Sequence, residues 1–376
     1  MAKVAVLGSL PESLLNFRGP LLAEMVAAGH EVHAMAPPAS GDVVSGLAAI
    51  GVCFHSIPMR RAGISPIRDL CTLYRVSRLL RALQPECLLS YTIKPVIYGS
   101  MAARLAGIPR VYSMITGLGY TFSGADSKSL LVGWLARKLY RLALSGNTRV
   151  FFQNPDNLQL FLKQDLLRAS DRSVLINGSG VDLTHFAPAP YPHQPSFLMI
   201  ARLLKDKGIL EYVAAARELK RRFPELRFRL AGWIDDNPMA ISQRDLDAWI
   251  AEGVVEYLGH LADVRPAIAA AAVYVLPSYH EGMPRTVLEA MAMARAVITT
   301  DVPGCRETVV EGTNGYLVPP RDVAALATAM ARFVESPEMV PVMGAASRHL
   351  AECRFDVHKV NRVILDTMEL TGEKSL

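Results

Sequence analysis

The chain has 376 residues, of which 51% are hydrophobic and 20% charged, so it is predicted to be globular and to form two domains. Its five cysteines form no CxxC pair and no His–Cys cluster, which indicates reduced thiols without a disulfide framework or a zinc site. The apolar start is broken by Gly8 and ended by Pro11, which favours a buried strand over a secretory signal. The longest later apolar run, 266–277, is far shorter than the roughly 20 residues that span a bilayer.

Charge is distributed unevenly along the chain. Through Pro190 there are 19 Lys and Arg against 11 Asp and Glu, whereas the remainder has 21 against 24. A basic half suits nucleic acid, an anionic membrane surface or a phosphorylated substrate as a partner.

The first half alternates apolar strands with helical patterns. The predicted order begins with a strand at 3–7, a glycine-bearing loop, a helix that stops at Gly29 and a strand at 31–36. Further strands are expected at 86–91, 110–115, 149–154 and 173–178. Continuous apolar strands that alternate with helices indicate a parallel sheet covered on both faces.

A second round of the same pattern begins near Ser196. Helices are expected at 208–223 and 285–294, between strands at 197–200, 228–233, 255–259, 273–278 and 296–301. The chain is therefore predicted to be α/β, with two doubly wound Rossmann-like domains, 1–190 and 191–376, facing each other across a cleft. The segment 186–195 has linker composition, and the last helix, about 356–371, is a candidate to pack back on the first domain.

Two cations follow the first strand of the second half within one loop. Arg202 and Lys207 precede Gly208 and a helix start, where guanidinium, ammonium and helix amides all favour an anion such as a diphosphate. An ordinary solvated loop would have the same composition. Gly232, after the next strand, either lets a ligand approach the backbone or is a plain turn glycine.

The stretch HEGMPRTVLEAMA contains two glutamates, Glu281 and Glu289. They are open to three interpretations: an acid–base pair that cleaves sugar bonds, ligands for hydroxyl groups, or ordinary surface charges. Pro284 suits the first helical position, which would put Glu281 in the loop and Glu289 inside the helix. Backbone amides at a helix start lack internal partners, so we expect a phosphate there, a sugar near Glu281 and a ribose near Glu289.

Four motifs together resemble the retaining glycosyltransferases of family four, which have the GT-B fold: EGMPRTVLEAMA, ARLLKDKG, NGSGVDLTHF and GTNGYLVPPRD. The resemblance covers nearly the whole chain. Within the family, the chain is similar to enzymes that add α-1,3-linked N-acetylgalactosamine (GalNAc) to an undecaprenyl-diphosphate-linked sugar. It implies transfer of a sugar, with N-acetylhexosamine and especially GalNAc favoured, from a UDP-sugar to a polyprenyl-diphosphate-linked saccharide in surface polysaccharide assembly. The UDP-sugar is then a substrate, and no cofactor is implied.

The resemblance also assigns roles residue by residue. Arg202 and Lys207 match the pair that holds the donor diphosphate, and Glu281 matches a glutamate near the donor sugar hydroxyls. These three are the expected catalytic residues. The expected donor-binding residues are Gly19, Gly232, Gly259, Gly282, Met283, Pro284 and Glu289.

The chain departs from the family pattern at one position. Many relatives carry a histidine where this sequence, in ITGLG, has Thr116. A threonine cannot accept a proton as histidine does, which favours a front-face mechanism in which the leaving diphosphate takes the acceptor's proton. Thr116 and Lys94, the latter as a ligand for a phosphate, are the candidate acceptor residues.

No metal is predicted, because the only DxD, Asp245–Asp247, lies in a polar helical pattern away from any strand end, and no P-loop occurs.

The basic amphipathic segments 68–83 and 127–144 either lie on anionic lipid or simply pack on a sheet. With the resemblance, they favour a cytoplasmic protein that is peripheral on the inner face of the plasma membrane and binds no nucleic acid. Two alternatives stay open: a hydrolysing UDP-sugar 2-epimerase and a non-catalytic UDP-sugar-binding subunit of an assembly complex.

Overall fold

The computed structural model describes residues 1–60, 65–117, 127–167, 172–192, 194–235, 237 and 239–371. The chain forms two compact units. Unit 1 comprises Met1–Ser179 together with His358–Leu376, and unit 2 comprises Gly180–Val357. Among the helices that the structure describes, none is both long enough and apolar enough to cross a membrane.

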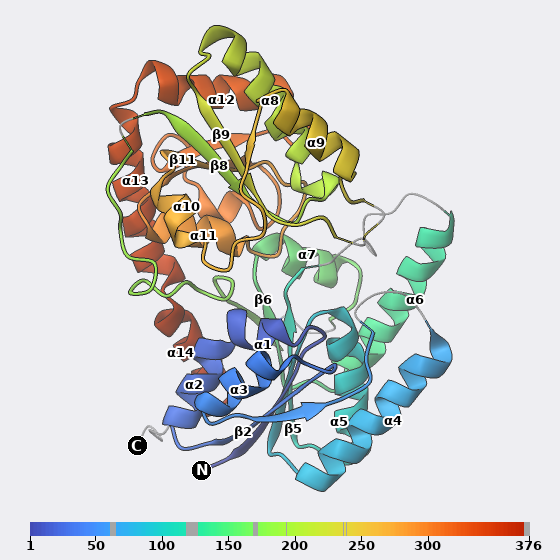
Figure 1. Ribbon diagram of the computed structural model, residues 1–376. Coiled ribbons are helices and arrows are strands. Elements are labelled where there is room, and N and C mark those ends of the chain that lie inside the picture. The colour runs from blue at the N-terminus through green and yellow to red at the C-terminus, as the bar shows by residue number, and fades with distance from the viewer. Residues whose placement is uncertain are drawn as a thin grey trace. The chain divides into compact units, whose positions relative to one another are not determined.

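Unit 1 contains a seven-stranded parallel sheet with the order β3-β2-β1-β4-β5-β6-β7 (Figure 1). One face is covered by α1, α2, α3 and α14, and the other by α4, α5 and α6. The strands are β1 (Lys3–Leu7), β2 (Glu31–Ala36), β3 (Cys53–Ser56), β4 (Cys87–Tyr91), β5 (Arg110–Ile115), β6 (Arg149–Phe152) and β7 (Ser173–Leu175). The helices are α1 (Glu12–Asn16), α2 (Gly19–Ala27), α3 (Gly41–Ala49), α4 (Pro66–Leu83), α5 (Ser100–Ala106), α6 (Ser127–Leu144), α7 (Pro155–Lys163) and α14 (Val357–Thr367).

The last helix of the chain, α14, is part of the unit 1 core. Val360, Ile364 and Met368 are buried in the same apolar cluster as β1 and α2. The Nη1 of Arg110, at the start of β5, donates to the carbonyl oxygen of Met368 over 3.0 Å. The chain therefore returns to unit 1 after it has completed unit 2.

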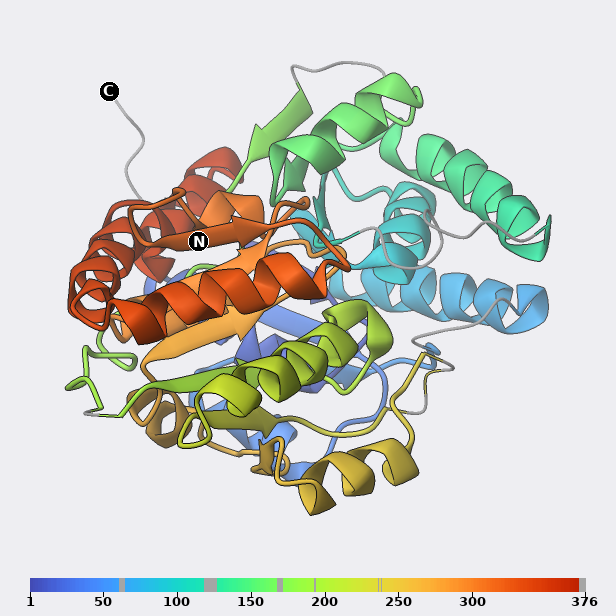
Figure 2. The ribbon, with the colours of Figure 1, turned by 90° about the horizontal axis from the view of Figure 1, so that it is seen from above.

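Unit 2 contains a six-stranded parallel sheet with the order β10-β9-β8-β11-β12-β13. Helices α8 and α12 lie side by side (Figure 2), and α11 packs against α13. The strands are β8 (Ser196–Ile200), β9 (Arg227–Ala231), β10 (Glu256–Tyr257), β11 (Val273–Leu276), β12 (Ala296–Thr300) and β13 (Gly315–Val318). The helices are α8 (Ile209–Arg222), α9 (Gln243–Ala251), α10 (Arg265–Ala269), α11 (Arg285–Ala292), α12 (Val323–Glu335) and α13 (Met339–Leu350).

The division between the units lies at Ser179–Gly180, earlier than the predicted boundary at 190–191. Two arginines of unit 2 hold the intervening segment through its carbonyl oxygens. The Nη2 of the buried Arg295 donates to Ala189 and Pro190, both over 2.9 Å. Arg348 Nη1 donates to the carbonyls of Leu183 and Phe186. The segment has linker composition, but it is fastened to unit 2.

Two strands were not predicted from the sequence. Strand β3 is short, mixes apolar and polar residues and is partly exposed at the edge of its sheet. Strand β13 is also a short edge strand, of four residues. Short segments of this kind have neither a long apolar run nor a clear alternation, which are the signals for a strand.

Candidate active site

The predicted catalytic residues of unit 2 gather at the carboxyl edge of its sheet. Arg202 and Lys207 follow β8, and Glu281 follows β11. Strands β8 and β11 are neighbours in the sheet but lead to opposite sides of it, since β9 and β10 extend beyond β8 while β12 and β13 extend beyond β11. In open α/β sheets ligands bind at such a switch point.

Lys207 and Glu281 form an ion pair at this point. The Nζ of Lys207 lies 2.5 Å from Oε1 of Glu281, and the two side chains are only 15% and 16% exposed. A charge-assisted hydrogen bond is stronger than a neutral one, and partial burial reduces its screening by water. The loops after β8 and β11 thus bring together two of the three residues expected to act in catalysis.

A glycine allows these two loops to approach each other. Gly208 has a φ of +75°, and a Cβ at this position would collide with the carbonyl oxygen of Pro277. The backbone N–H of Tyr279 donates to the carbonyl oxygen of Asp206 over 2.8 Å, and the hydroxyl of Ser278 donates to the same oxygen over 3.2 Å. The short 3-10 helix that carries Lys207 is therefore bonded directly to the loop that carries Glu281.

The loop of Glu281 is supported from its other side by the turn after β12. The backbone N–H of Glu281 donates to the carbonyl oxygen of Pro303 over 3.1 Å. Gly304 has a φ of +85°, and a Cβ there would collide with the carbonyl groups of Glu281 and Gly282. Sequence reasoning missed this support, although a Pro-Gly dipeptide shortly after a strand signals a tight turn.

Arg202 is also paired with a carboxylate. Its Nη1 lies 2.8 Å from Oδ2 of Asp235, in the loop after β9, and the two side chains are 30% and 19% exposed. Gly232 starts that loop with a φ of +147°, and a Cβ on it would collide with the carbonyl oxygen of Ala201. The role of Asp235 was not predicted from the sequence, because an acidic residue in a polar loop has no distinctive local pattern.

Glu289 lies inside α11, as the sequence predicts, but it is buried and paired. Its Oε1 lies 2.8 Å from Nε of Arg285, one turn earlier, and Glu289 is 6% exposed. Burial raises the pKa of the Glu289 carboxyl, and Arg285 opposes this shift. Pro284 was predicted at the first helical position. It is instead the N-cap, with an extended backbone (φ −75°, ψ 104°), and the helix begins one residue later.

Met283 and Gly282 lie in the loop between the glutamates. Gly282 is buried, and the side chain of Met283 is half-buried and packs against the unit 2 core. The loop is therefore anchored at its apolar residue, while Glu281 is held by Lys207.

The loops after β9 and β10 are joined at the same edge of the sheet. The N–H of Gly232 donates to the carbonyl oxygen of Gly259 over 2.9 Å, and the Tyr257 hydroxyl donates to the carbonyl oxygen of Gly232 over 2.8 Å. The rings of Trp233 and His260 then meet edge to face, with centroids 4.8 Å apart. Trp233 remains 44% exposed, so this pair presents an aromatic surface that the sequence reasoning did not identify.

The remaining predicted residues belong to unit 1. Gly19 is the first residue of α2, and Thr116 directly follows β5; the motif of Thr116 continues into residues outside the described ranges. Lys94 Nζ lies 2.8 Å from Oδ1 of the buried Asp69, so its charge is balanced within the protein, whereas the sequence suggested a cation available to a phosphate. Burial raises the pKa of the Tyr98 hydroxyl, and the negative charge of Asp69 raises it further.

The DxD residues lie on α9, where the sequence placed them. The Asp245 carboxylate accepts from the hydroxyl of Ser242, and the Asp247 carboxylate accepts from the amide of Gln243, both over 2.7 Å.

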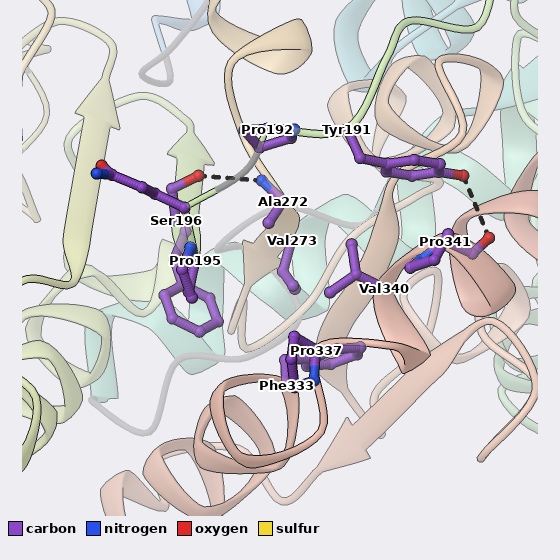
Figure 3. Close-up of a pocket in the computed structure, with 12 residues that line it drawn as sticks. Tyr191, Pro192, Pro195, Ser196, Ala272, Val273, Phe333, Pro337, Val340 and Pro341 are labelled. Carbon is purple, nitrogen blue, oxygen red and sulfur yellow. Dashed lines mark hydrogen bonds between the residues drawn. The ribbon is translucent and has the colours of Figure 1, made fainter.

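A separate pocket opens at the amino ends of β8 and β11, at the opposite edge of the sheet (Figure 3). Its walls include Tyr191, Phe333 and Val340, and the Tyr191 hydroxyl donates to the carbonyl oxygen of Pro341 over 3.2 Å. None of the predicted site residues is among those that line it. The pocket is thus distinct from the candidate site.

Comparison with family models matches both halves of the chain. Residues 19–178 match the "Glycosyl transferase 4-like domain", and residues 194–336 match "Glycosyl transferases group 1". Together the two models cover most of the chain.

Two similar curated proteins act on lipid-linked sugars, according to their names. The N,N'-diacetylbacillosaminyl-diphospho-undecaprenol alpha-1,3-N-acetylgalactosaminyltransferase of Campylobacter jejuni is 26% identical over 351 residues and covers 90% of each chain. The UDP-Gal:alpha-D-GlcNAc-diphosphoundecaprenol alpha-1,3-galactosyltransferase of Escherichia coli is 25% identical over 319 residues, which are 81% of this chain and 80% of the relative.

Solved structures confirm the predicted GT-B fold. Sucrose-phosphate synthase from Thermosynechococcus elongatus superposes with a TM-score of 0.81 at 18% identity and covers 98% of both chains. HepE from Anabaena, in complex with UDP-glucose, superposes with a TM-score of 0.76 at 17% identity, over 98% of this chain and all of that one.

Proposed function

The chain belongs to the group 1 glycosyltransferases, with a glycosyl transferase 4-like first half, and on that premise we propose that it moves a sugar from UDP to a polyprenyl-diphosphate-linked saccharide with retention of configuration. The observation that carries this proposal is the Lys207–Glu281 pair at the switch point of unit 2, with Arg202 in the same loop after β8. It supports assigning the donor diphosphate to the two cations and the donor sugar to Glu281.

The proposed chemistry follows from the charges that develop during the reaction. Departure of a nucleoside diphosphate leaves negative charge on the phosphates and positive charge on the sugar ring. Arg202 and Lys207 would stabilise the phosphates, and the Glu281 carboxylate would stabilise the ring and bind its hydroxyls. Because Lys207 is held by its hydrogen bond to Glu281 before the donor arrives, little reorganisation of this cation is required.

Retention is proposed to follow a front-face mechanism, in which a phosphate oxygen of the leaving group accepts the proton of the acceptor hydroxyl. Two features of unit 1 support this mechanism. By the resemblance, Thr116 takes the place of a histidine in the family pattern, and the ammonium of Lys94 is already bound by Asp69. Neither side chain is suited to remove a proton.

A UDP-sugar is the proposed donor, with N-acetylhexosamine and especially GalNAc favoured. The names of the two curated relatives, one of which specifies UDP-Gal and the other N-acetylgalactosaminyl transfer, support this class. The Trp233–His260 surface lies at the carboxyl edge of β9 and β10, beside Gly232 and Gly259. An exposed aromatic pair offers a nucleobase a face for stacking.

The acceptor is proposed to be a saccharide on a polyprenyl diphosphate, such as undecaprenyl diphosphate, in surface polysaccharide or O-antigen assembly. Both relatives' names specify undecaprenol-linked diphosphates. The net positive charge of the first half suits both a diphosphate and anionic lipid.

We further propose that unit 1 attaches to the cytoplasmic face of the membrane through α4 and α6. On α4, Ile67, Leu70 and Tyr74 are 85%, 66% and 61% exposed along one helix face. On α6, Trp134 and Leu142 are each 53% exposed. Helix α5 lies between α4 and α6 (Figures 1 and 2). Arg81 of α4 donates to a carbonyl oxygen of α5, and α5 contacts α6. Their exposed basic residues include Arg68, Arg75, Arg78, Arg81 and Lys138.

These exposed faces match what an interfacial helix requires. Apolar side chains enter the acyl boundary of the bilayer, and flanking arginines and lysines bind anionic headgroups. Of the apolar residues expected on α6, Leu139 is half-buried and packs against the unit 1 core, while the side chain of Leu131 lies outside the described residues.

The transfer is proposed to need neither a metal ion nor a cofactor, since Arg202 and Lys207 supply the positive charge that a metal would otherwise provide. The test is a UDP-release assay with UDP-GalNAc, UDP-GlcNAc, UDP-Gal and GDP-mannose, with and without a lipid-linked acceptor and with and without EDTA. We expect UDP release from a UDP-N-acetylhexosamine that depends on the acceptor and persists in EDTA.

The same assay separates the alternatives. Release of UDP and free sugar without acceptor would favour the hydrolysing 2-epimerase, and binding without turnover would favour a non-catalytic subunit. Strict Mg²⁺ dependence of the chemical step would overturn the metal-independent mechanism. The family membership already favours a transferase over an epimerase.

A further inference from the structure

The Arg202–Asp235 ion pair is not explained by the function proposed above. Arg202 is expected to bind the donor diphosphate, yet its guanidinium lies 2.8 Å from the Asp235 carboxylate. Lys207 is paired as well, but with Glu281, which has an expected role of its own toward the donor sugar. Asp235 has no such role, and a fixed negative charge beside a diphosphate site would weaken the binding of an anion.

The backbone holds Asp235 opposite Arg202. The N–H of Leu203 donates to the carbonyl oxygen of Trp233 over 2.9 Å, and the N–H of Ile241 donates to the carbonyl oxygen of Leu203 over 2.8 Å. The segment that contains Asp235 is thus bonded at both its start and its end to the residue after Arg202. These hydrogen bonds keep the two ends of the segment close to the residue that follows Arg202.

The pair is also accessible enough to be exchanged. The side chains of Arg202 and Asp235 are 30% and 19% exposed, so water and a ligand reach both. Because both side chains are partly exposed, water screens part of the attraction and can hydrate both groups when they separate, so the free energy that the pair contributes is modest. A diphosphate carries more negative charge than one carboxylate and offers several oxygens to a guanidinium.

We propose that Asp235 is an internal counter-ion that occupies Arg202 in the nucleotide-free enzyme and gives it up to the donor diphosphate. The inference rests on the proposed function insofar as Arg202 binds that diphosphate. The carboxylate keeps the guanidinium oriented toward the site and prevents weakly charged anions from occupying it. A ligand with two phosphates displaces the carboxylate, whereas a ligand with a single weak charge does not.

The experiment measures the binding of UDP and of inorganic pyrophosphate by calorimetry. The variants are Asp235→Asn and the control Glu252→Gln, which removes the same single charge from an exposed pair that Glu252, directly after α9, forms with Arg217 of α8. Asp235→Asn should tighten the binding of both ligands about fivefold, the amount expected from losing a competing pair worth about 1 kcal/mol. Glu252→Gln should leave both affinities unchanged.

A double-mutant cycle tests whether the effect of Asp235→Asn on ligand binding depends on Arg202. In an Arg202→Gln background, Asp235→Asn should no longer tighten binding. The proposal is overturned if Asp235→Asn leaves binding unchanged or weakens it, if Glu252→Gln tightens binding equally, or if the gain persists without Arg202. Pyrophosphate keeps this test independent of the nucleoside: wild-type protein that binds pyrophosphate but not UDP would refute the UDP donor and still test Asp235. Wild-type protein that binds neither would refute both proposals.

Discussion

Lys207 and Glu281 follow different strands, yet the Lys207 Nζ lies 2.5 Å from the Glu281 Oε1. The contact requires Gly208, whose missing Cβ makes room for the carbonyl oxygen of Pro277. It also requires the hydrogen bond between the backbone of Tyr279 and Asp206. The contact between Lys207 and Glu281 therefore depends on two loops that are hydrogen-bonded to each other. Substitutions in either loop can test it.

Replacing Glu281 with glutamine should slow transfer strongly without unfolding the protein. The glutamine oxygen still accepts a hydrogen bond from Lys207, but the negative charge that would stabilise the sugar ring is lost. We expect the turnover number to fall by about 10²- to 10³-fold, with the affinity for UDP little changed. Initial rates and thermal melting by circular dichroism measure the two effects. Near-normal turnover would contradict the role of Glu281.

Glu289 should make stability and nucleotide binding depend on pH. Burial raises the pKa of the Glu289 carboxyl in the folded state above the ordinary value of 4.5. Its contribution to the free energy of unfolding is therefore complete below about pH 4.5, where the carboxyl is protonated in both the folded and the unfolded state. The contribution is lost as the pH rises through the raised pKa. Relative to Glu289→Gln, the wild type should therefore lose free energy of unfolding as the pH rises upward from about 4.5. Urea unfolding at a series of pH values measures this difference.

The same titration should affect UDP binding with the opposite sign. Only the ionised carboxylate accepts hydrogen bonds from both ribose hydroxyls, so the wild-type affinity should increase as Glu289 loses its proton. Glu289→Gln should bind UDP more weakly and without this pH dependence. Parallel pH curves for the two proteins would show that Glu289 does not contact the nucleotide.

The exposed face of α4 should determine membrane binding. The double variant Ile67→Ser, Leu70→Ser should reduce partitioning onto phosphatidylglycerol vesicles by at least about tenfold, since each buried aliphatic side chain contributes about 1.5–3 kcal/mol. Val342→Ser, in unit 2, is the matched control, because Val342 is 68% exposed. Vesicle sedimentation gives the bound fraction. Equal partitioning of both variants would exclude α4 as the membrane-binding helix.

Gly208→Ala should destabilise unit 2 and lower activity. The left-handed backbone alone costs about 1–2 kcal/mol for a residue with a Cβ, and the collision with Pro277 adds to this. Gly253→Ala is the matched control, because Gly253 has a φ of +66° with nothing near its Cβ position. Denaturant unfolding should give a larger loss for Gly208→Ala than for Gly253→Ala. Equal losses would mean that the loop after β11 adjusts freely.

Much of the fold was predictable because its signals are local. Continuous apolar strands such as β8 and β11 and helix stops such as Gly29 are visible within a few residues of sequence, and most of the predicted strands and helices are present. The short edge strands β3 and β13 lack such signals. The boundary of unit 2 was placed too late because Arg295 and Arg348 fasten a linker-like segment over long sequence distances.

The candidate site was predictable only where motifs fall in single loops. The cations after β8 and the two glutamates around α11 were identified from sequence, and their roles stay predictions. Their partners were not identified: Asp235 meets Arg202, and Asp69 meets Lys94, only through the folding of separate segments. Trp233 and His260 likewise come together only because the loops after β9 and β10 are bonded through Gly232 and Gly259.

The return of α14 to unit 1 has a consequence for biosynthesis. A ribosome makes the chain from its amino end, so the seven strands of unit 1 emerge first, while Val360, Ile364 and Met368 are added only after all of unit 2. Until then, the apolar surface that these side chains cover on unit 1 has no cover from its own chain. Unit 2 is continuous in sequence and can fold as it emerges. Unit 1, although it is begun first, is therefore the last to be completed.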